Sequence, residues 1–254
     1  MTNPLKERLR SGRPAFGTWL TFASPAVAEA LALLQPDWLL VDTEHAAVDD
    51  RTLEEMLRAV SAAGTGVTPL VRVAANDVAL VKKALDRGAL GVLVPLVNSP
   101  EEARMAVAAC RYPPAGVRGV AGARASRYGL SLPDYFAGWN DAVLVGVQIE
   151  TRPALEAAEA IARVDGVDLL FVGPNDLSAS LGLFRRFDHP DYRAAVRRVL
   201  EAARRAGKAA GYMARDAEEA AAMAEQGFQF VSVATDARML MGAASQAFQR
   251  LRGA

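Results

Sequence analysis

Two carboxylates follow neighbouring apolar stretches in the second half of this 254-residue chain. Gln148 and Glu150 close the stretch that begins at Val143, and Asp176 follows the stretch that ends at Gly173. Residues two apart in a strand point the same way, so Gln148 and Glu150 would share a face. Carboxylates from adjacent strands suit a hard cation such as Mg²⁺, Mn²⁺ or Co²⁺. The alternative is that Glu150 caps one helix and Asp176 begins another.

A histidine and an arginine end two earlier apolar stretches. His45 follows Asp42 by three residues, and a carboxylate partner could hold its imidazole and raise its basicity, which suits a general base. Arg72 needs an anionic partner at the end of an apolar run, either a substrate or an internal acid. His189 precedes a proline where a helix should begin, which indicates a structural role. With only two histidines, a catalytic zinc site of the three-histidine type is excluded.

The lysines exclude one mechanism of carbon–carbon bond cleavage. The chain has only Lys6, Lys82, Lys83 and Lys208, none of which follows a predicted strand. A Schiff-base aldolase needs a lysine in its site, so a carbanion here would have to be stabilised by a metal.

Two further segments could bind anions. Residues 173–178 read as a helix amino terminus whose free backbone amides could hold a substrate carboxylate. The basic loop that contains Arg118, Arg124 and Arg127 could grip a second substrate, or it could face solvent or another subunit.

Eight apolar runs alternate with amphipathic helical segments along the chain. The predicted strands are residues 17–22, 38–44, 68–73, 91–97, 143–150, 167–173, 208–213 and 228–234. Nearly continuous apolar runs are typical of parallel strands covered on both faces. Eight such units predict one (β/α)8 TIM barrel domain over residues 1–254. The active sites of such barrels lie at the carboxyl ends of the strands, where the polar residues above would meet.

Composition narrows the class of protein. The formal net charge is zero and 52% of residues are hydrophobic, which argues against a nucleic-acid or acidic-membrane binder. No stretch approaches the roughly 18–20 apolar residues of a membrane helix. Cys110 is the only cysteine, and residues 1–13 lack the apolar core of a signal peptide, so a cytoplasmic protein is expected.

Seven segments together resemble the HpcH/HpaI aldolase family, which includes 4-hydroxy-2-oxoheptanedioate aldolase and 2-dehydro-3-deoxyglucarate aldolase. They occur in family order and cover most of the chain. The segments are Gly17-Thr-Trp-Leu, Val41-Asp-Thr-Glu-His45, Pro69-Leu-Val-Arg72, Leu85-Asp-Arg-Gly88, Tyr112-Pro-Pro with Gly116-Val-Arg-Gly119, Gln148-Ile-Glu150-Thr and Phe171-Val-Gly-Pro-Asn-Asp-Leu177.

The resemblance implies a class II, metal-dependent aldolase that cleaves 4-hydroxy-2-oxo acids to pyruvate and an aldehyde. By motif, His45 would be the proton acceptor, Asp86 would raise its basicity, and Arg72 would stabilise the transition state. Gln148 and the segment of Gly173, Asn175 and Asp176 would bind substrate, and Glu150 and Asp176 would hold the metal. The loop after Gly119 is shorter than in some relatives, which leaves the acceptor aldehyde open.

The resemblance also implies a homo-hexamer built from dimers that exchange the last helix, after Asp236. Three rival functions remain: an oxaloacetate decarboxylase, a citramalyl-type lyase using the same metal-stabilised enolate, or a non-catalytic protein that binds an oxo acid.

Overall fold

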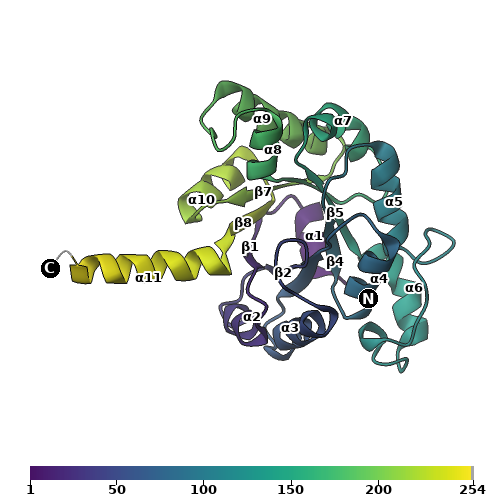
Figure 1. Ribbon diagram of the computed structural model, residues 1–254. Coiled ribbons are helices and arrows are strands. Elements are labelled where there is room, and N and C mark those ends of the chain that lie inside the picture. Colours follow the sequence, from purple (N-terminus) through teal and green to yellow (C-terminus); the bar gives the residue numbers. More distant parts are fainter. Residues whose placement is uncertain (253–254) are drawn as a thin grey trace.

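Eight parallel strands close into a barrel in the computed structural model, which describes residues 1–252 (Figure 1). Each strand pairs with its neighbours in the chain, and β8 pairs with β1. The strands are β1 (Ala15–Leu20), β2 (Trp38–Asp42), β3 (Thr68–Arg72), β4 (Gly91–Val94), β5 (Leu144–Ile149), β6 (Leu169–Val172), β7 (Ala209–Ala214) and β8 (Phe230–Thr235). The predicted (β/α)8 barrel is confirmed. A single domain over residues 1–254 stays a prediction, and residues 253–254 lie outside the described part.

Apart from α11, the helices pack around this barrel, and most strands are followed by a helix (Figure 1). They are α1 (Pro4–Arg10), α2 (Pro25–Ala32), α3 (Asp50–Ala62), α4 (Val78–Asp86), α5 (Pro100–Cys110), α6 (Leu132–Ala142), α7 (Arg152–Ala162), α8 (Pro174–Ser180), α9 (Pro190–Arg205), α10 (Ala217–Gln226) and α11 (Asp236–Arg252), with a short 3₁₀ turn at Arg124–Ser126. Each of α2, α3 and α5 begins after a side chain that accepts a hydrogen bond from a free amide of its first turn.

The inside of the barrel is packed rather than hollow. Trp38 stacks on Phe230 with ring centroids 4.0 Å apart, and Leu5 and Leu9 of α1 belong to the same buried cluster. Gly17 is required here, because a Cβ atom would lie 2.2 Å from the Trp38 ring. A filled interior leaves a site only at the barrel ends.

The last helix, α11, projects away from the barrel (Figure 1). Its first residue, Asp236, accepts hydrogen bonds from the backbone amides of Thr21 (2.8 Å) and Phe22 (2.9 Å), which fix where the helix leaves. Leu240, Met241, Phe248 and Leu251 are exposed along it. Within residues 1–252, none of the helices has the length and apolar composition needed to cross a membrane.

Candidate functional site

Asp42 and Arg72 form a buried ion pair at the carboxyl ends of β2 and β3. The strand register places the two residues opposite each other. Arg72 donates from Nε to Asp42 Oδ1 (2.9 Å) and from Nη2 to Oδ2 (2.7 Å), and its guanidinium lies 4.5 Å from the Trp19 ring centroid. This bidentate pair is the internal partner that the sequence left as an alternative for Arg72.

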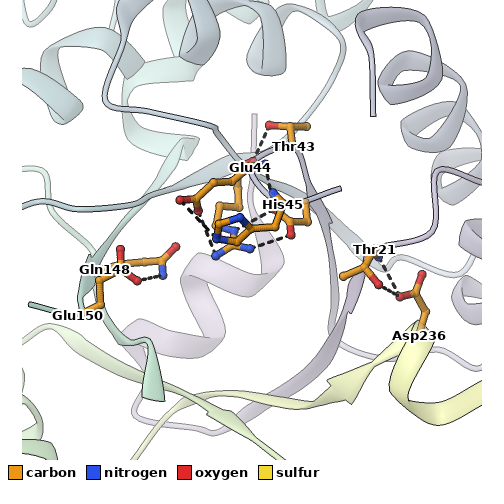
Figure 2. A network of polar contacts seen from close by, with 9 residues as sticks. Thr21, Thr43, Glu44, His45, Gln148, Glu150 and Asp236 are labelled. Carbon is orange, nitrogen blue, oxygen red and sulfur yellow. Dashed lines mark hydrogen bonds and ion pairs between the residues drawn. The ribbon is translucent and has the colours of Figure 1, made fainter. Parts of the chain in front are cut away.

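Glu44 and His45 lie in the loop that follows β2 (Figure 2). Asp42 Oδ1 shapes this loop by accepting from the backbone amides of Glu44 (3.0 Å) and His45 (3.4 Å). Glu44 reaches Arg72 Nη1 (3.1 Å), and burial is the largest effect that raises the pKa of its carboxyl.

The His45 side chain is 68% exposed, and its Nε2 lies 3.7 Å from Glu44 Oε1. Within residues 1–252, no hydrogen bond or ion pair joins this imidazole to the Asp42 carboxylate, which binds the Arg72 guanidinium and the backbone amides of Glu44 and His45 instead. The structure thus places Glu44 next to the imidazole, and leaves the ring accessible at the barrel mouth.

Gln148 and Glu150 lie side by side and buried at the end of β5 (Figure 2). Gln148 donates from Nε2 to Glu150 Oε2 (2.6 Å), and the backbone amide of Leu96 donates to Glu150 Oε1 (2.8 Å). Burial raises the pKa of Glu150 to about 7, with the charges of Asp176 and Glu44 adding to the rise. Gln148 Oε1 is buried with no hydrogen-bond partner in residues 1–252.

Gly173 and Asp176 complete this side of the mouth, between β6 and α8. A Cβ atom on Gly173 would lie 2.7 Å from Glu150 Oε2 and 3.3 Å from Gln148 Nε2, so the missing side chain leaves room for both. Asn175 and Asp176 are exposed in the first turn of α8, which has no side-chain cap.

The donor set fits a hard cation with open coordination positions. Within residues 1–252, no three acidic, histidine or cysteine side chains are close enough to hold a metal ion by themselves. Glu150 and Asp176 would supply two carboxylates to such an ion, and substrate and water would supply the rest, as is usual for Mg²⁺. The mutual charge of Glu150, Asp176 and Glu44 favours such an ion.

Asp86 and the basic loop lie in a separate cluster. Asp86 accepts from Arg118 Nη2 (2.7 Å), and the fully buried Arg118 side chain lies over the rings of Tyr112 (4.7 Å) and Trp139 (4.5 Å). Arg124 donates to the backbone oxygen of Arg87 (2.5 Å). Arg118 and Arg124 thus bind groups of this chain itself. Within residues 1–252, no hydrogen bond or ion pair joins Asp86 to the His45 imidazole.

Sequence reasoning gave three neighbours of this site no role. Glu44 belongs to the segment Val41-Asp-Thr-Glu-His45. Its position one residue before His45 is the feature from which the sequence predicts an acid beside the imidazole. The Trp19 ring under Arg72 and the Leu96 amide depend on packing, and Leu96 has a left-handed φ of 54° that a leucine rarely adopts.

The fold and the side chains at its mouth define a (β/α)8 barrel with a cluster of acidic residues at the carboxyl ends of its strands, where the active sites of such barrels lie. The sequence profile of HpcH/HpaI aldolase/citrate lyase matches residues 15–243, and the chain belongs to this family. Its members generally depend on a divalent metal.

Individual relatives are similar to this chain over almost its whole length. The hydroxypyruvate/pyruvate aldolase of Paraburkholderia phytofirmans is 44% identical and covers 99% of this chain and 98% of its own. The 4-hydroxy-2-oxo-heptane-1,7-dioate aldolase of Klebsiella pneumoniae is 45% identical, covering 94% and 90%. A crystal structure of a family protein from Burkholderia cenocepacia superposes with a TM-score of 0.95 at 43% identity, covering 99% and 100%.

Proposed function

We propose that this protein is a class II aldolase that reversibly cleaves 4-hydroxy-2-oxo acids to pyruvate and an aldehyde. The observation that carries the proposal is the convergence of Glu150, Asp176, Arg72 and His45 on one barrel mouth, within a family of aldolases. The absence of a lysine from the strand ends is consistent with the metal-dependent class.

Glu150 and Asp176 would hold Mg²⁺, Mn²⁺ or Co²⁺, which when bound polarises the ketone of the substrate. The cluster of acids supports this assignment, because Asp176 and Glu44 both raise the pKa of Glu150 and a cation would relieve that repulsion. Gln148 orients Glu150 through its Nε2 bond.

His45 would move the proton in this reaction. In cleavage it would take the C4 hydroxyl proton, the C3–C4 bond would break, and the aldehyde would leave as the electron pair passes to the ketone oxygen. The proton would then be delivered to C3 of the enolate, which gives the methyl group of pyruvate. In synthesis it takes a proton from the pyruvate methyl group. Arg72 stabilises the negative charge on the ketone oxygen, and Asp42 holds Arg72 in position. The amides of Gly173 and Asn175 would bind the substrate carboxylate.

The first test is proton NMR of pyruvate in deuterated water, with metal-stripped protein and then with added Mg²⁺ or Co²⁺. The methyl signal should disappear only when metal is present. Glu150→Ala and Asp176→Ala should each abolish metal-dependent exchange. Full exchange by both variants without metal would overturn the proposal.

His45→Ala should slow exchange by about 10²- to 10⁴-fold while weakening pyruvate binding far less, because general-base catalysis contributes about that much. Binding is measured by calorimetry with the same metal. Unchanged exchange would remove this role from His45.

The family also includes citrate lyases, so a second candidate is a lyase or oxaloacetate decarboxylase that uses the same site. Oxaloacetate turnover that exceeds aldol cleavage would favour it. Pyruvate and metal binding without exchange or cleavage would instead indicate a non-catalytic oxo-acid-binding protein.

A homo-hexamer with exchanged last helices is the proposed assembly. The exposed apolar residues along α11 support it, since such surfaces mark interfaces between proteins.

A further inference from the structure

A cavity of about 550 Å³ lies between α9 and α10, on the outer side of β7. Both helices pack against this strand, outside the barrel wall (Figure 1). The lining residues come from the segment before α9, from α9, from the end of β7 and from α10. Within residues 1–252, none of the residues proposed above for metal binding or proton transfer lines this cavity, so it is separate from the barrel mouth.

Two tyrosines form a buried part of the lining. Tyr192 of α9 and Tyr212 of β7 are each 2% exposed, and their hydroxyl oxygens lie 3.2 Å apart. Either hydroxyl can donate to the other, and within residues 1–252 this is the only hydrogen bond that either forms. The pair has two hydroxyl protons and one bond, so one proton remains to be donated. A buried hydroxyl proton requires an acceptor, and the cavity is the space that both residues line.

A positive charge is held close to this tyrosine pair. Arg215, which directly follows β7, donates to Glu219 Oε2 from its backbone amide (2.7 Å) and from Nε (2.9 Å). Its guanidinium carbon lies 5.9 Å from the centroid of the Phe187 ring. Within residues 1–252, neither Nη group of Arg215 forms a hydrogen bond or an ion pair. The guanidinium is thus fixed through Nε, and its outer N–H groups are available as donors.

The tyrosine hydroxyls act as neutral donors. Burial is the largest of the effects that raise the pKa of Tyr212 to about 12, and the positive charge of Arg215 opposes that rise. Burial likewise raises the pKa of Tyr192. Both groups therefore keep their protons at neutral pH. A hydroxyl proton and the Arg215 guanidinium together offer hydrogen bonds to an anion from two sides of its charge.

The rest of the lining is apolar below and positively charged at the rim. Phe187, Val196 and Met223 supply apolar surface. The charged lining residues are four arginines and two acids, which gives the cavity an excess of positive charge although the whole chain has a net charge of zero. A bare ion would leave the apolar surface without a partner, whereas a molecule with an apolar body would cover it.

We propose that this cavity is a second binding site, for a small carboxylate with an apolar body. The Nη groups of Arg215 and the remaining hydroxyl proton of the tyrosine pair donate to the carboxylate oxygens, and the body of the ligand contacts Val196 and Met223. One fixed guanidinium and one hydroxyl suit the single charge of a carboxylate better than the double charge of a phosphate. The site lies outside the barrel, so the inference does not rest on the proposed aldolase function.

The test is calorimetric titration of the full-length, metal-free protein with benzoate, with its neutral amide benzamide and with inorganic phosphate. Benzoate should bind one site per chain, about 10- to 100-fold more tightly than either of the others, the range expected for hydrogen bonds to a charged group. Pyruvate with Mg²⁺ should leave the affinity for benzoate unchanged. Displacement of benzoate by pyruvate with Mg²⁺ would place it at the barrel mouth instead and overturn the inference.

Two variants locate the bound benzoate. Arg215→Gln should weaken benzoate binding by about tenfold or more. The double variant Tyr192→Phe/Tyr212→Phe should do the same, and it removes both hydroxyls at once, so that neither is left buried without a partner. Thermal unfolding followed by circular dichroism checks that both variants remain folded.

Arg205→Gln is the matched control for Arg215→Gln. Arg205 pairs with an acid one helical turn away, Glu201 (3.2 Å), as Arg215 does, but it does not line the cavity. It should bind benzoate as the parent does. Equal losses in Arg205→Gln and Arg215→Gln, equal affinities for benzoate and phosphate, or no binding of benzoate at millimolar concentrations would each overturn the inference.

Discussion

At the scale of single residues, the main feature of the barrel mouth is that the buried Arg72 pairs with acidic side chains of the chain itself. Arg72 is almost fully buried and lies between Asp42 and Glu44, so its charge is compensated before any substrate binds. Removing one partner of a buried pair leaves an uncompensated charge, which costs far more than losing a surface pair. Asp42 is therefore a positioning residue for Arg72 as well as the residue that shapes the His45 loop.

Asp42→Ala is expected to lower the free energy of unfolding by about 3 kcal/mol, the lower end of the range for a broken buried pair, because Arg72 loses its bidentate partner and keeps only Glu44 (3.1 Å). Urea denaturation followed by circular dichroism measures this change. Asp50→Ala is the control: Asp50 is half-exposed and paired with Lys83 (2.8 Å), and its loss should cost about 1 kcal/mol or less. Equal costs for the two variants would mean that the Arg72 pair does not stabilise the fold.

At the scale of elements, the site is made where strand ends meet turns of unusual shape. β4 stops at Val94, and the left-handed Leu96 that follows turns its amide toward Glu150. β6 stops at Val172, and Gly173 passes close to Glu150 without a side chain. Together these two segments determine where the Glu150 carboxylate lies.

Gly173→Ala should weaken metal and pyruvate binding by about tenfold, since the new Cβ would lie 2.7 Å from Glu150 Oε2 and force the carboxylate to move. The φ of Gly173 is −90°, which alanine adopts freely, so the backbone should not be strained. Calorimetric titration of the variant with Mg²⁺ and pyruvate measures the effect.

Gly242→Ala is the matched control, because a Cβ there meets no atom within 4 Å. It should bind both ligands as the parent does. Parental affinity in Gly173→Ala would show that the space beside Glu150 is not part of the site.

At the scale of the whole molecule, the barrel is closed and its interior is packed with side chains. Helix α11 projects from the barrel, and several of its apolar residues are exposed to solvent (Figure 1). The anchor of this helix, Asp236, remains tied to the loop after β1 through Thr21 (Figure 2). A rigidly anchored helix with an exposed apolar face suits contact with another copy of the chain.

Deletion of residues 240–254 should reduce the oligomeric mass measured by light scattering, because it removes Leu240, Met241, Phe248 and Leu251 and keeps the Asp236 anchor. The far-ultraviolet circular dichroism of the barrel should change only by the lost helix. An unchanged mass would exclude α11 as the assembly element.

The sequence by itself determined the architecture and the chemical character of the site. Apolar runs and helical periods depend on neighbours in the chain, so all eight strands were predictable, with ends displaced by up to three residues at β4 and by two at several others. Because parallel strands of a barrel end at one rim, the grouping of His45, Arg72, Glu150 and Asp176 followed as an expectation from the strand order.

Only the tertiary structure decided which of these side chains pair. The β2–β3 register pairs Asp42 with Arg72, and the imidazole of His45 lies beside Glu44. Packing of the basic loop brings Arg118 to Asp86. A cavity of about 220 Å³ beside Asn175 likewise combines Arg185 and Arg238, which are 53 positions apart in the chain. Pairings of this kind depend on register and loop conformation, which long-range packing sets and local sequence patterns do not encode.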